Sequence, residues 1–96
     1  MVLESELLER TVTIGNQLGL HARVATAMVQ TMKRHTCQVT VAKDGMEVDA
    51  RSVLGLLLLA ATPGAELTIR AHGPGSLEAV EQISKLLENN GSDHVG

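Results

Sequence analysis

The segment CQVTVAKDGMEVDA, residues 37–50, decides the fold class. Apolar residues stand at every second position on both sides of a central Lys43-Asp44-Gly45 triplet. Alternation with a period of two is typical of strands that bury one face, and Asp-Gly is typical of a tight hairpin turn. The segment therefore predicts two adjacent strands joined as a hairpin, with alternating apolar residues Cys37, Val39, Val41, Met46, Val48 and Ala50.

Before this hairpin, the sequence predicts one strand and one helix. Residues 11–14 alternate polar with apolar side chains, which indicates a strand with Val12 and Ile14 facing inward. From about residue 22 to residue 34, apolar residues recur every three or four positions. This spacing predicts an amphipathic helix with one buried face.

After the hairpin, the sequence predicts a helix, a strand and a second helix. Ser52 is a good N-cap for a short helix over the apolar residues 53–61. Alternation over residues 67–71 predicts a strand, and Ser76 is a candidate cap for a helix that ends near Asn89. The resulting order, βαββαβα, predicts an α+β open-faced sandwich with a mostly antiparallel four-stranded sheet covered by helices on one face. The pattern alone does not give the order of the strands.

Length and composition indicate one globular domain. The chain has 96 residues, of which 44% are hydrophobic and 20% charged. We expect residues 9–90 to form the domain, with flexible ends at residues 1–8 and 91–96. A net charge of −3 and the absence of Phe, Tyr and Trp argue against nucleic-acid binding, because that function needs basic surface and often uses aromatic stacking.

The sequence also indicates a cytoplasmic protein. Its N-terminus, MVLESELLER, does not resemble a secretory signal, and the longest run without a polar side chain, residues 53–61, is too short to cross a bilayer. Cys37 is the only cysteine, so no internal disulfide can form, and we expect it to be a small buried residue. No metal or other cofactor is indicated, and a monomer is expected.

His21 is the candidate for chemistry. It lies in GNQLGLHARVA, residues 15–25, at the predicted start of the first helix. The unpaired N–H groups of a first helical turn favour an anion there, and together with Arg23 they disfavour a protonated imidazole. A neutral His21 can attack a phosphoryl group, and the planar guanidinium of Arg23 can bind its oxygens. Since no partner base is evident, this pattern favours a group carrier over a complete enzyme.

Two motifs resemble a known family. LGLHARVA, residues 18–25, is similar to the active-site motif of HPr, the histidine-containing phosphocarrier of the bacterial phosphoenolpyruvate-dependent sugar phosphotransferase system. ARSVLGLLLLAA, residues 50–61, resembles the helix of that family that begins at a regulatory serine. The resemblance extends from about Arg10 to Asn89. It implies an open-faced β-sandwich with three helices over a four-stranded antiparallel sheet.

The resemblance also implies roles and partners. His21 would accept the phosphoryl group on Nδ1 from phospho-enzyme I and pass it to IIA proteins, and Arg23 would stabilise the transfer. Ser52 matches a serine near the active site that HPr kinase/phosphorylase modifies in some bacteria. An apolar docking patch would consist of Val53, Leu54 and Leu57, with Leu20 at its rim.

Several alternatives remain open on the sequence. The chain could serve a nitrogen-related phosphotransferase branch instead of the sugar branch. It could be a regulatory protein that passes no phosphoryl group between partners and acts through phosphorylated Ser52 and protein binding. It could also be a small-molecule-sensing α+β domain in which His21 has no chemical role.

One position departs from the family pattern. The family usually has proline directly after the arginine, whereas this chain has Val24. Valine restores a backbone N–H that proline lacks and loosens the start of the helix slightly. We expect the chemistry to be retained, with the lifetime of the phosphohistidine or the choice of partner open to change.

Overall fold

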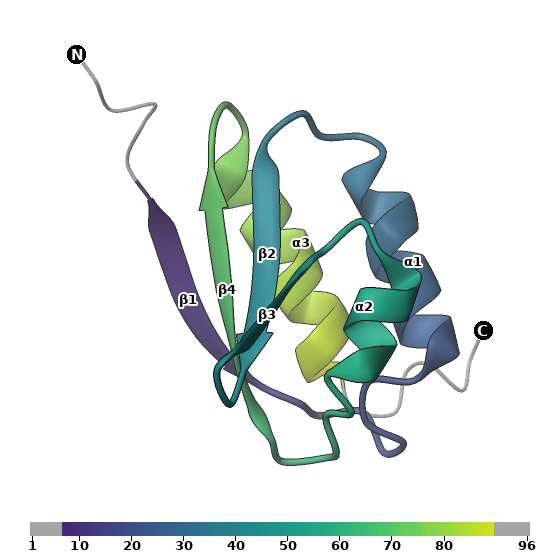
Figure 1. Ribbon diagram of the computed structural model, residues 1–96. Helices are drawn as coiled ribbons and strands as arrows, with labels where there is room; N and C mark the ends of the chain where they lie inside the picture. The colour runs from purple at the N-terminus through teal and green to yellow at the C-terminus, as the bar shows by residue number, and fades with distance from the viewer. Residues whose placement is uncertain (1–6, 90–96) are drawn as a thin grey trace.

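The computed structural model describes residues 7–89, which form four strands and three helices (Figure 1). The elements are β1 (Leu8–Thr13), α1 (Ala22–Met32), β2 (Gln38–Lys43), β3 (Met46–Asp49), α2 (Val53–Leu58), β4 (Glu66–His72) and α3 (Ser76–Glu88). Their order is βαββαβα, as the sequence predicts. The expected open-faced sandwich is confirmed, because the three helices cover one face of the sheet and leave the other open.

The four strands form one antiparallel sheet in the order β1-β4-β2-β3. The predicted hairpin is confirmed as β2 and β3, in which Lys43 pairs with Met46. Between them, Asp44 and Gly45 have φ angles of 50° and 85°. Two successive residues with positive φ match the right-handed twist of the adjoining strands, which is why Asp-Gly suits this turn.

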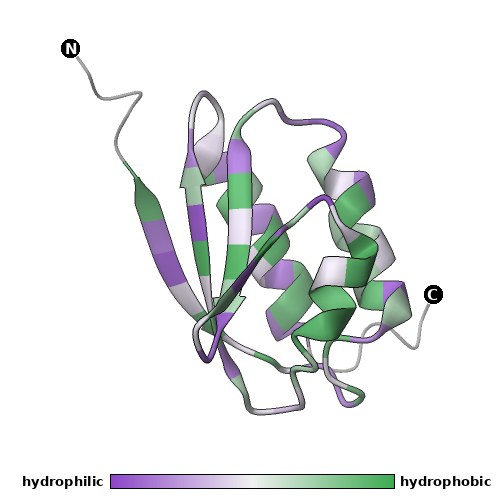
Figure 2. Cartoon of the chain, in the orientation of Figure 1, coloured by the Kyte–Doolittle hydropathy of each residue, from purple (hydrophilic) through white to green (hydrophobic). Residues whose placement is uncertain are grey.

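The core lies between the helices and the covered face of the sheet. Hydrophobic and hydrophilic residues alternate along the strands, so each strand presents apolar side chains to the helices (Figure 2). The chain has no aromatic residue, and aliphatic side chains and methionines fill the interior. The largest fully buried side chains include Met28, Met32, Leu56, Leu67, Ile69, Ile83 and Leu87. None of the helices within residues 7–89 is long and apolar enough to span a lipid bilayer.

Several element boundaries differ from the predictions. β1 begins at Leu8 instead of Thr11, because β4 continues far enough to pair Leu8 with Ala71. Leu8 therefore belongs to the sheet and not to an N-terminal extension. Leu7 precedes the strand, and residues 1–6 of that extension and the predicted tail lie outside the described residues. α2 ends at Leu58 instead of continuing to residue 61, because Ala60 adopts a left-handed φ of 51°.

The predicted cap of the last helix is wrong by one residue. Gly75, with φ of 80°, occupies the N-cap position of α3, and no side chain caps this end. The Ser76 hydroxyl instead donates to the carbonyl oxygen of Gly73 at 2.7 Å. The glycines of this turn reverse the chain within a few residues, which moves Ser76 into the helix.

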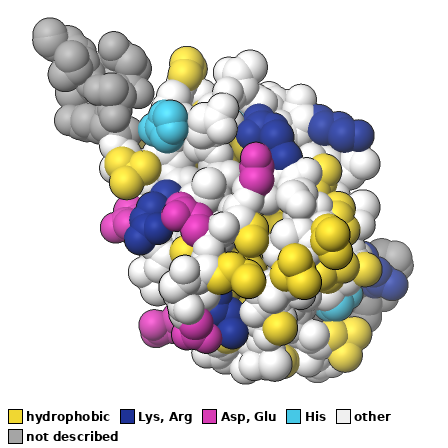
Figure 3. Space-filling model, viewed as in Figure 1, with side chains coloured by type: hydrophobic (Ala, Val, Ile, Leu, Met, Phe, Trp, Pro, Cys, Tyr) yellow, Lys and Arg dark blue, Asp and Glu magenta, His cyan; other side chains and the backbone are white. Residues whose placement is uncertain are grey.

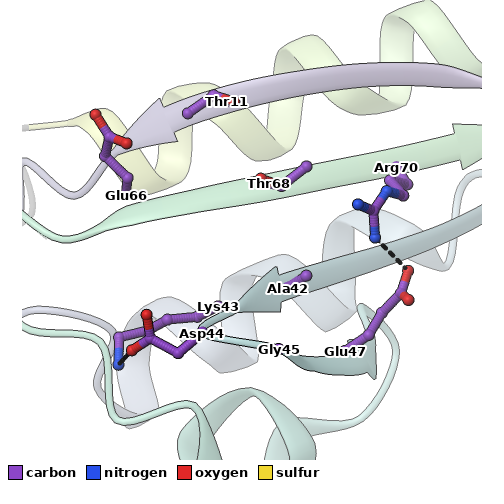
Figure 4. A pocket seen from close by; sticks show the side chains of 9 residues that line it. All are labelled: Thr11, Ala42, Lys43, Asp44, Gly45, Glu47, Glu66, Thr68 and Arg70. Carbon is purple, nitrogen blue, oxygen red and sulfur yellow. Dashed lines mark hydrogen bonds and ion pairs between the residues drawn. The ribbon is translucent and has the colours of Figure 1, made fainter.

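On the open face, polar side chains connect all four strands. Arg70 on β4 forms ion pairs with Glu9 on β1 and Glu47 on β3, and Thr40 on β2 donates to Glu47. The Thr40 hydroxyl, with a smaller contribution from Arg70, lowers the pKa of Glu47, and the hydrogen bond to Glu9 raises the pKa of Arg70. Arg70 and Glu47 also border a shallow hollow of about 310 Å³, seen in Figure 4. Since the pairs are exposed, they contribute little to stability.

Arg51 joins the segment between β3 and α2 to the end of α1. Its guanidinium donates to the carbonyl oxygens of Cys37, Met32 and His35, at 3.1, 3.3 and 2.7 Å. The last carbonyls of a helix have no partner within the helix, and charged donors satisfy them well. The Arg51 side chain therefore satisfies carbonyl groups at and just beyond the end of α1, and it connects the residue before Ser52 to them.

We predict that Arg51→Met destabilises the protein by about 2–3 kcal/mol, because three carbonyls lose a charged donor. The free energy of unfolding, measured in urea, checks this value. Arg34→Met is the matched control, because Arg34 is an exposed arginine just beyond the same helix and should change stability by less than about 0.5 kcal/mol. Equal effects of the two substitutions would contradict the assigned role of Arg51.

Candidate functional site

The loop between β1 and α1 begins against the end of α3. The Gly15 N–H donates to the Leu87 carbonyl oxygen at 2.9 Å, and the Asn16 side-chain amide donates to the Leu86 carbonyl oxygen at 3.1 Å. A Cβ atom on residue 15 would lie 2.2 Å from the carbonyl oxygen of Glu88. Only glycine permits so close an approach of two backbones.

The same loop ends against the segment that follows α2. Gly19 has φ of 76°, and a Cβ atom there would lie 2.3 Å from the carbonyl oxygen of Ala61. The next residue, Leu20, donates its N–H to that oxygen at 2.9 Å. Both ends of the loop are therefore fixed by backbone contacts, which sets where the following residue, His21, enters α1.

His21 occupies the N-cap position of α1. Its backbone is extended, with φ of −106° and ψ of −179°, and its carbonyl accepts the first helical hydrogen bond from Ala25 at 2.9 Å. The ring Nδ1 accepts from the Arg23 N–H at 3.3 Å. An accepting Nδ1 carries a lone pair, so the proton of the neutral ring resides on Nε2. Nε2 is buried and has no hydrogen-bond partner among the described residues.

This geometry distinguishes the two ring nitrogens chemically. Nδ1 faces the N–H groups of an 11-residue helix, where a bound anion is favourable. The first turn contains no acidic residue that would repel such an anion, and the exposed Arg23 adds positive charge. Nε2 is enclosed by protein. The arrangement allows a nucleophilic attack from Nδ1 and favours the negative charge that the attack would bring there.

Ser52 is the N-cap of α2, as predicted. Its hydroxyl oxygen accepts from the Gly55 N–H at 2.9 Å. Ser52 precedes α2, whereas the loop that carries His21 contacts Ala61, beyond the other end of this six-residue helix. The length of α2, about 9 Å at 1.5 Å per residue, therefore lies between the cap and that loop contact.

The predicted apolar patch is only partly at the surface. Leu54 is 69% exposed, whereas Val53 and Leu57 are half-buried against the core. Leu20 is 5% exposed and belongs to the core, so its predicted place at the rim of the patch is wrong. The bond from its backbone N–H to the Ala61 carbonyl oxygen holds Leu20 against the segment that follows α2.

Two exposed leucines were missing from the predicted patch. Leu58 on α2 is 60% exposed, and Leu18, in the loop beside the end of α2, is 73% exposed. Leu58 could have been found from its position four residues after Leu54, because such residues share one helix face. Figure 3 shows hydrophobic side chains gathered over α2. We call Leu18, Leu54 and Leu58 the leucine surface.

We predict that Gly19→Ala destabilises the fold by about 3 kcal/mol or more, because it adds backbone strain and a collision with the Ala61 carbonyl. Gly64→Ala is the matched control. Gly64 also has a positive φ, 87°, but open space around it, so strain alone should cost about 1 kcal/mol. Urea unfolding of both variants checks the difference, and similar losses would mean that the close contact at Gly19 is unimportant.

Comparisons with known sequences relate this arrangement to proteins of described function. Residues 8–89 match the family described as PTS HPr component phosphorylation site. Phosphocarrier protein HPr of Xylella fastidiosa (strain Temecula1) is 40% identical over 83 residues, which cover 86% of this chain and 93% of that protein. HPr-like protein Crh of Bacillus subtilis (strain 168) is 35% identical over 82 residues, which cover 85% of this chain and 96% of that protein.

A solved structure agrees with the sequence comparisons. The crystal structure of phosphocarrier protein HPr from Bacillus anthracis str. Ames superposes with a TM-score of 0.82 at 30% identity. The match covers 86% of this chain and 99% of that one. This chain belongs to the HPr family of phosphocarrier proteins.

Proposed function

We propose that this chain carries a phosphoryl group on His21 Nδ1, taking it from phospho-enzyme I and passing it to a IIA protein of the sugar phosphotransferase system. One observation carries the proposal: Nδ1 faces the N-terminus of α1 while Nε2 is buried. The family match supports the reaction class. We place the protein in the cytoplasm as a monomer, where one surface can meet donor and acceptor in turn.

The transfer uses groups that are already in position. The Nδ1 lone pair attacks phosphorus and forms an N–P bond, while the bond from phosphorus to the donor breaks and its electron pair leaves with the donor. The Arg23 N–H, which donates to Nδ1 before the reaction, is then beside the phosphoryl oxygens. The Arg23 guanidinium can bind two of these oxygens. Passing the group to the acceptor reverses the same steps.

Partner binding is assigned to the leucine surface. Its side chains lie on α2 and on the loop that positions His21, so a protein that covers them also reaches the ring. Exposed leucines gain the most from contact with an apolar partner surface. Val53 and Leu57 support the surface from below, because they pack against the core.

A regulatory role through Ser52 is the second candidate function. The similarity to Crh, named as HPr-like, favours it, as does the half-buried position of Ser52 at a helix start. HPr kinase/phosphorylase would transfer a phosphoryl group from ATP to the Ser52 hydroxyl, releasing ADP and the hydroxyl proton, and the new group carries about −1.5 to −2 charges. The guanidinium of Arg51 already donates to three carbonyls, so it is poorly placed to neutralise that charge. The charge would then face partners beside Leu54.

We predict that phosphoenolpyruvate and enzyme I label the wild-type chain with phosphate that is labile in acid and stable in alkali, and that His21→Ala abolishes the label. Transfer onward to purified IIA proteins of the sugar and nitrogen-related branches identifies the branch served. Ser52→Ala should label normally, because its hydroxyl takes no part in the transfer. Labelling of Ser52 alone, by a kinase and ATP, would establish the regulatory role instead.

We predict that Leu58→Ser raises the KM of phospho-enzyme I for this chain about tenfold, because a buried leucine contact is worth about 1.5 kcal/mol or more. The melting temperature should hardly change, since Leu58 is 60% exposed. Leu77→Ser on α3, where the leucine is 56% exposed, is the matched control and should leave the KM unchanged. A KM that rises equally in both variants would remove Leu58 from the docking surface.

A further inference from the structure

We infer that the backbone N–H of Val24 donates a hydrogen bond to the phosphoryl group on His21 and prolongs the life of the phosphohistidine. The inference rests on the proposed function and adds a backbone donor to the phosphoryl-binding groups. Val24 acts through its backbone, so its side chain takes no part in the chemistry.

Val24 lies in the first turn of α1, close in sequence to the N-cap residue His21. His21 is the N-cap, which makes Arg23 the second helical residue and Val24 the third. An acceptor on the side chain of an N-cap residue takes its hydrogen bond from the N–H of the second or third residue. The Arg23 N–H already donates to His21 Nδ1. An oxygen held one bond beyond phosphorus therefore lies where the N–H of the third residue can also reach it.

The backbone N–H of Val24 is available as a hydrogen-bond donor. Within residues 7–89, no group accepts a hydrogen bond from the Val24 N–H, whereas the Ala25 N–H is bonded to the His21 carbonyl. An unpaired N–H in the first turn gains a partner when an anion binds. Phosphorylation also removes the Nδ1 lone pair as an acceptor, which turns the Arg23 N–H toward the phosphoryl oxygens.

The side chain of Val24 packs in the hydrophobic core. Its side chain is 6% exposed and belongs to the core cluster, so the backbone at this residue is held in the first turn of α1. A donor fixed before the reaction needs little rearrangement to stabilise developing charge. A proline here would fit the first turn but would supply no N–H, so this chain has one more donor than a proline variant has.

The primary test follows the Val24 amide by NMR in the intact wild-type chain, before and after phosphorylation by enzyme I. We expect its proton to move downfield more than that of Thr26, one residue beyond the first helical bond. Its exchange with solvent should slow about tenfold, as a new hydrogen bond of about 1.4 kcal/mol would produce. An unchanged Val24 amide on a fully phosphorylated His21 would overturn the inference.

The second test compares phosphohistidine hydrolysis in Val24→Pro and Val24→Ala. Loss of the N–H should make the Val24→Pro phosphohistidine hydrolyse about three to ten times faster than the wild type. Val24→Ala keeps the N–H and should hydrolyse at nearly the wild-type rate. Equal rates in all three proteins would contradict the inference, as would Val24→Ala behaving like Val24→Pro.

Failure of this inference can be separated from failure of the proposed function. If enzyme I does not phosphorylate the wild type, the carrier role fails, and His21 can still be phosphorylated chemically with phosphoramidate for the NMR measurement. If enzyme I does phosphorylate His21 and the Val24 amide is unaffected, the carrier role stands and the inference fails. Should Val24→Pro not fold, the NMR measurement on the wild type still decides.

Discussion

The position of His21 depends on two backbone approaches that are too close for any side chain. At Gly15 and Gly19, the loop after β1 meets the ends of α3 and α2 at distances that exclude a Cβ atom. Hydrogen bonds at both ends fix the direction in which the chain enters α1. The ring then needs only its N-cap geometry to present Nδ1 to the first turn. The reactive group is thus positioned by contacts of the main chain.

The proposed site suits a carrier because it would stabilise a phosphoryl group without committing it to further chemistry. In the proposed transfer, a helix N-terminus and an arginine offer hydrogen bonds to the transferred oxygens, and the ring supplies the nucleophile. The site has to release the group as readily as it accepts it. Moderate stabilisation by exposed donors meets that requirement better than a deeply buried anion site would, because deep burial would slow transfer onward.

Local features were predicted from the sequence more accurately than distant ones. The hairpin and the Ser52 cap depend on neighbouring residues, whose preferences the sequence shows directly. The start of β1 depends on the length of β4, more than 50 residues away, and pattern alone could not give it. The same holds for Arg51, whose acceptors lie 14 to 19 residues earlier in the chain.

Burial in the apolar helix region was the hardest feature to predict. α2 and its surroundings are apolar nearly all round, so hydrophobicity does not separate the buried Leu20 from the exposed Leu58. Leu20 is buried because the backbone of its loop is bonded to Ala61, and that contact is not evident in the sequence. The chemistry of the site was easier to predict from the sequence. A histidine at a predicted helix start lies beside unpaired backbone N–H groups, and these groups favour an anion. The hydrogen bond that sets the role of each ring nitrogen could be found only in the structure.

The strand order also determines when a newly made chain can become functional. β1 and the His21 loop are made before the other elements, but within residues 7–89 β1 pairs only with β4, and the loop is bonded to residues near the ends of α2 and α3. During synthesis, the N-terminal part must therefore wait for nearly the whole described domain to leave the ribosome. A chain without α3 lacks the contacts that anchor the start of the His21 loop at Gly15 and Asn16. Under the proposed function, the topology thus restricts phosphate loading to chains that contain the whole described domain.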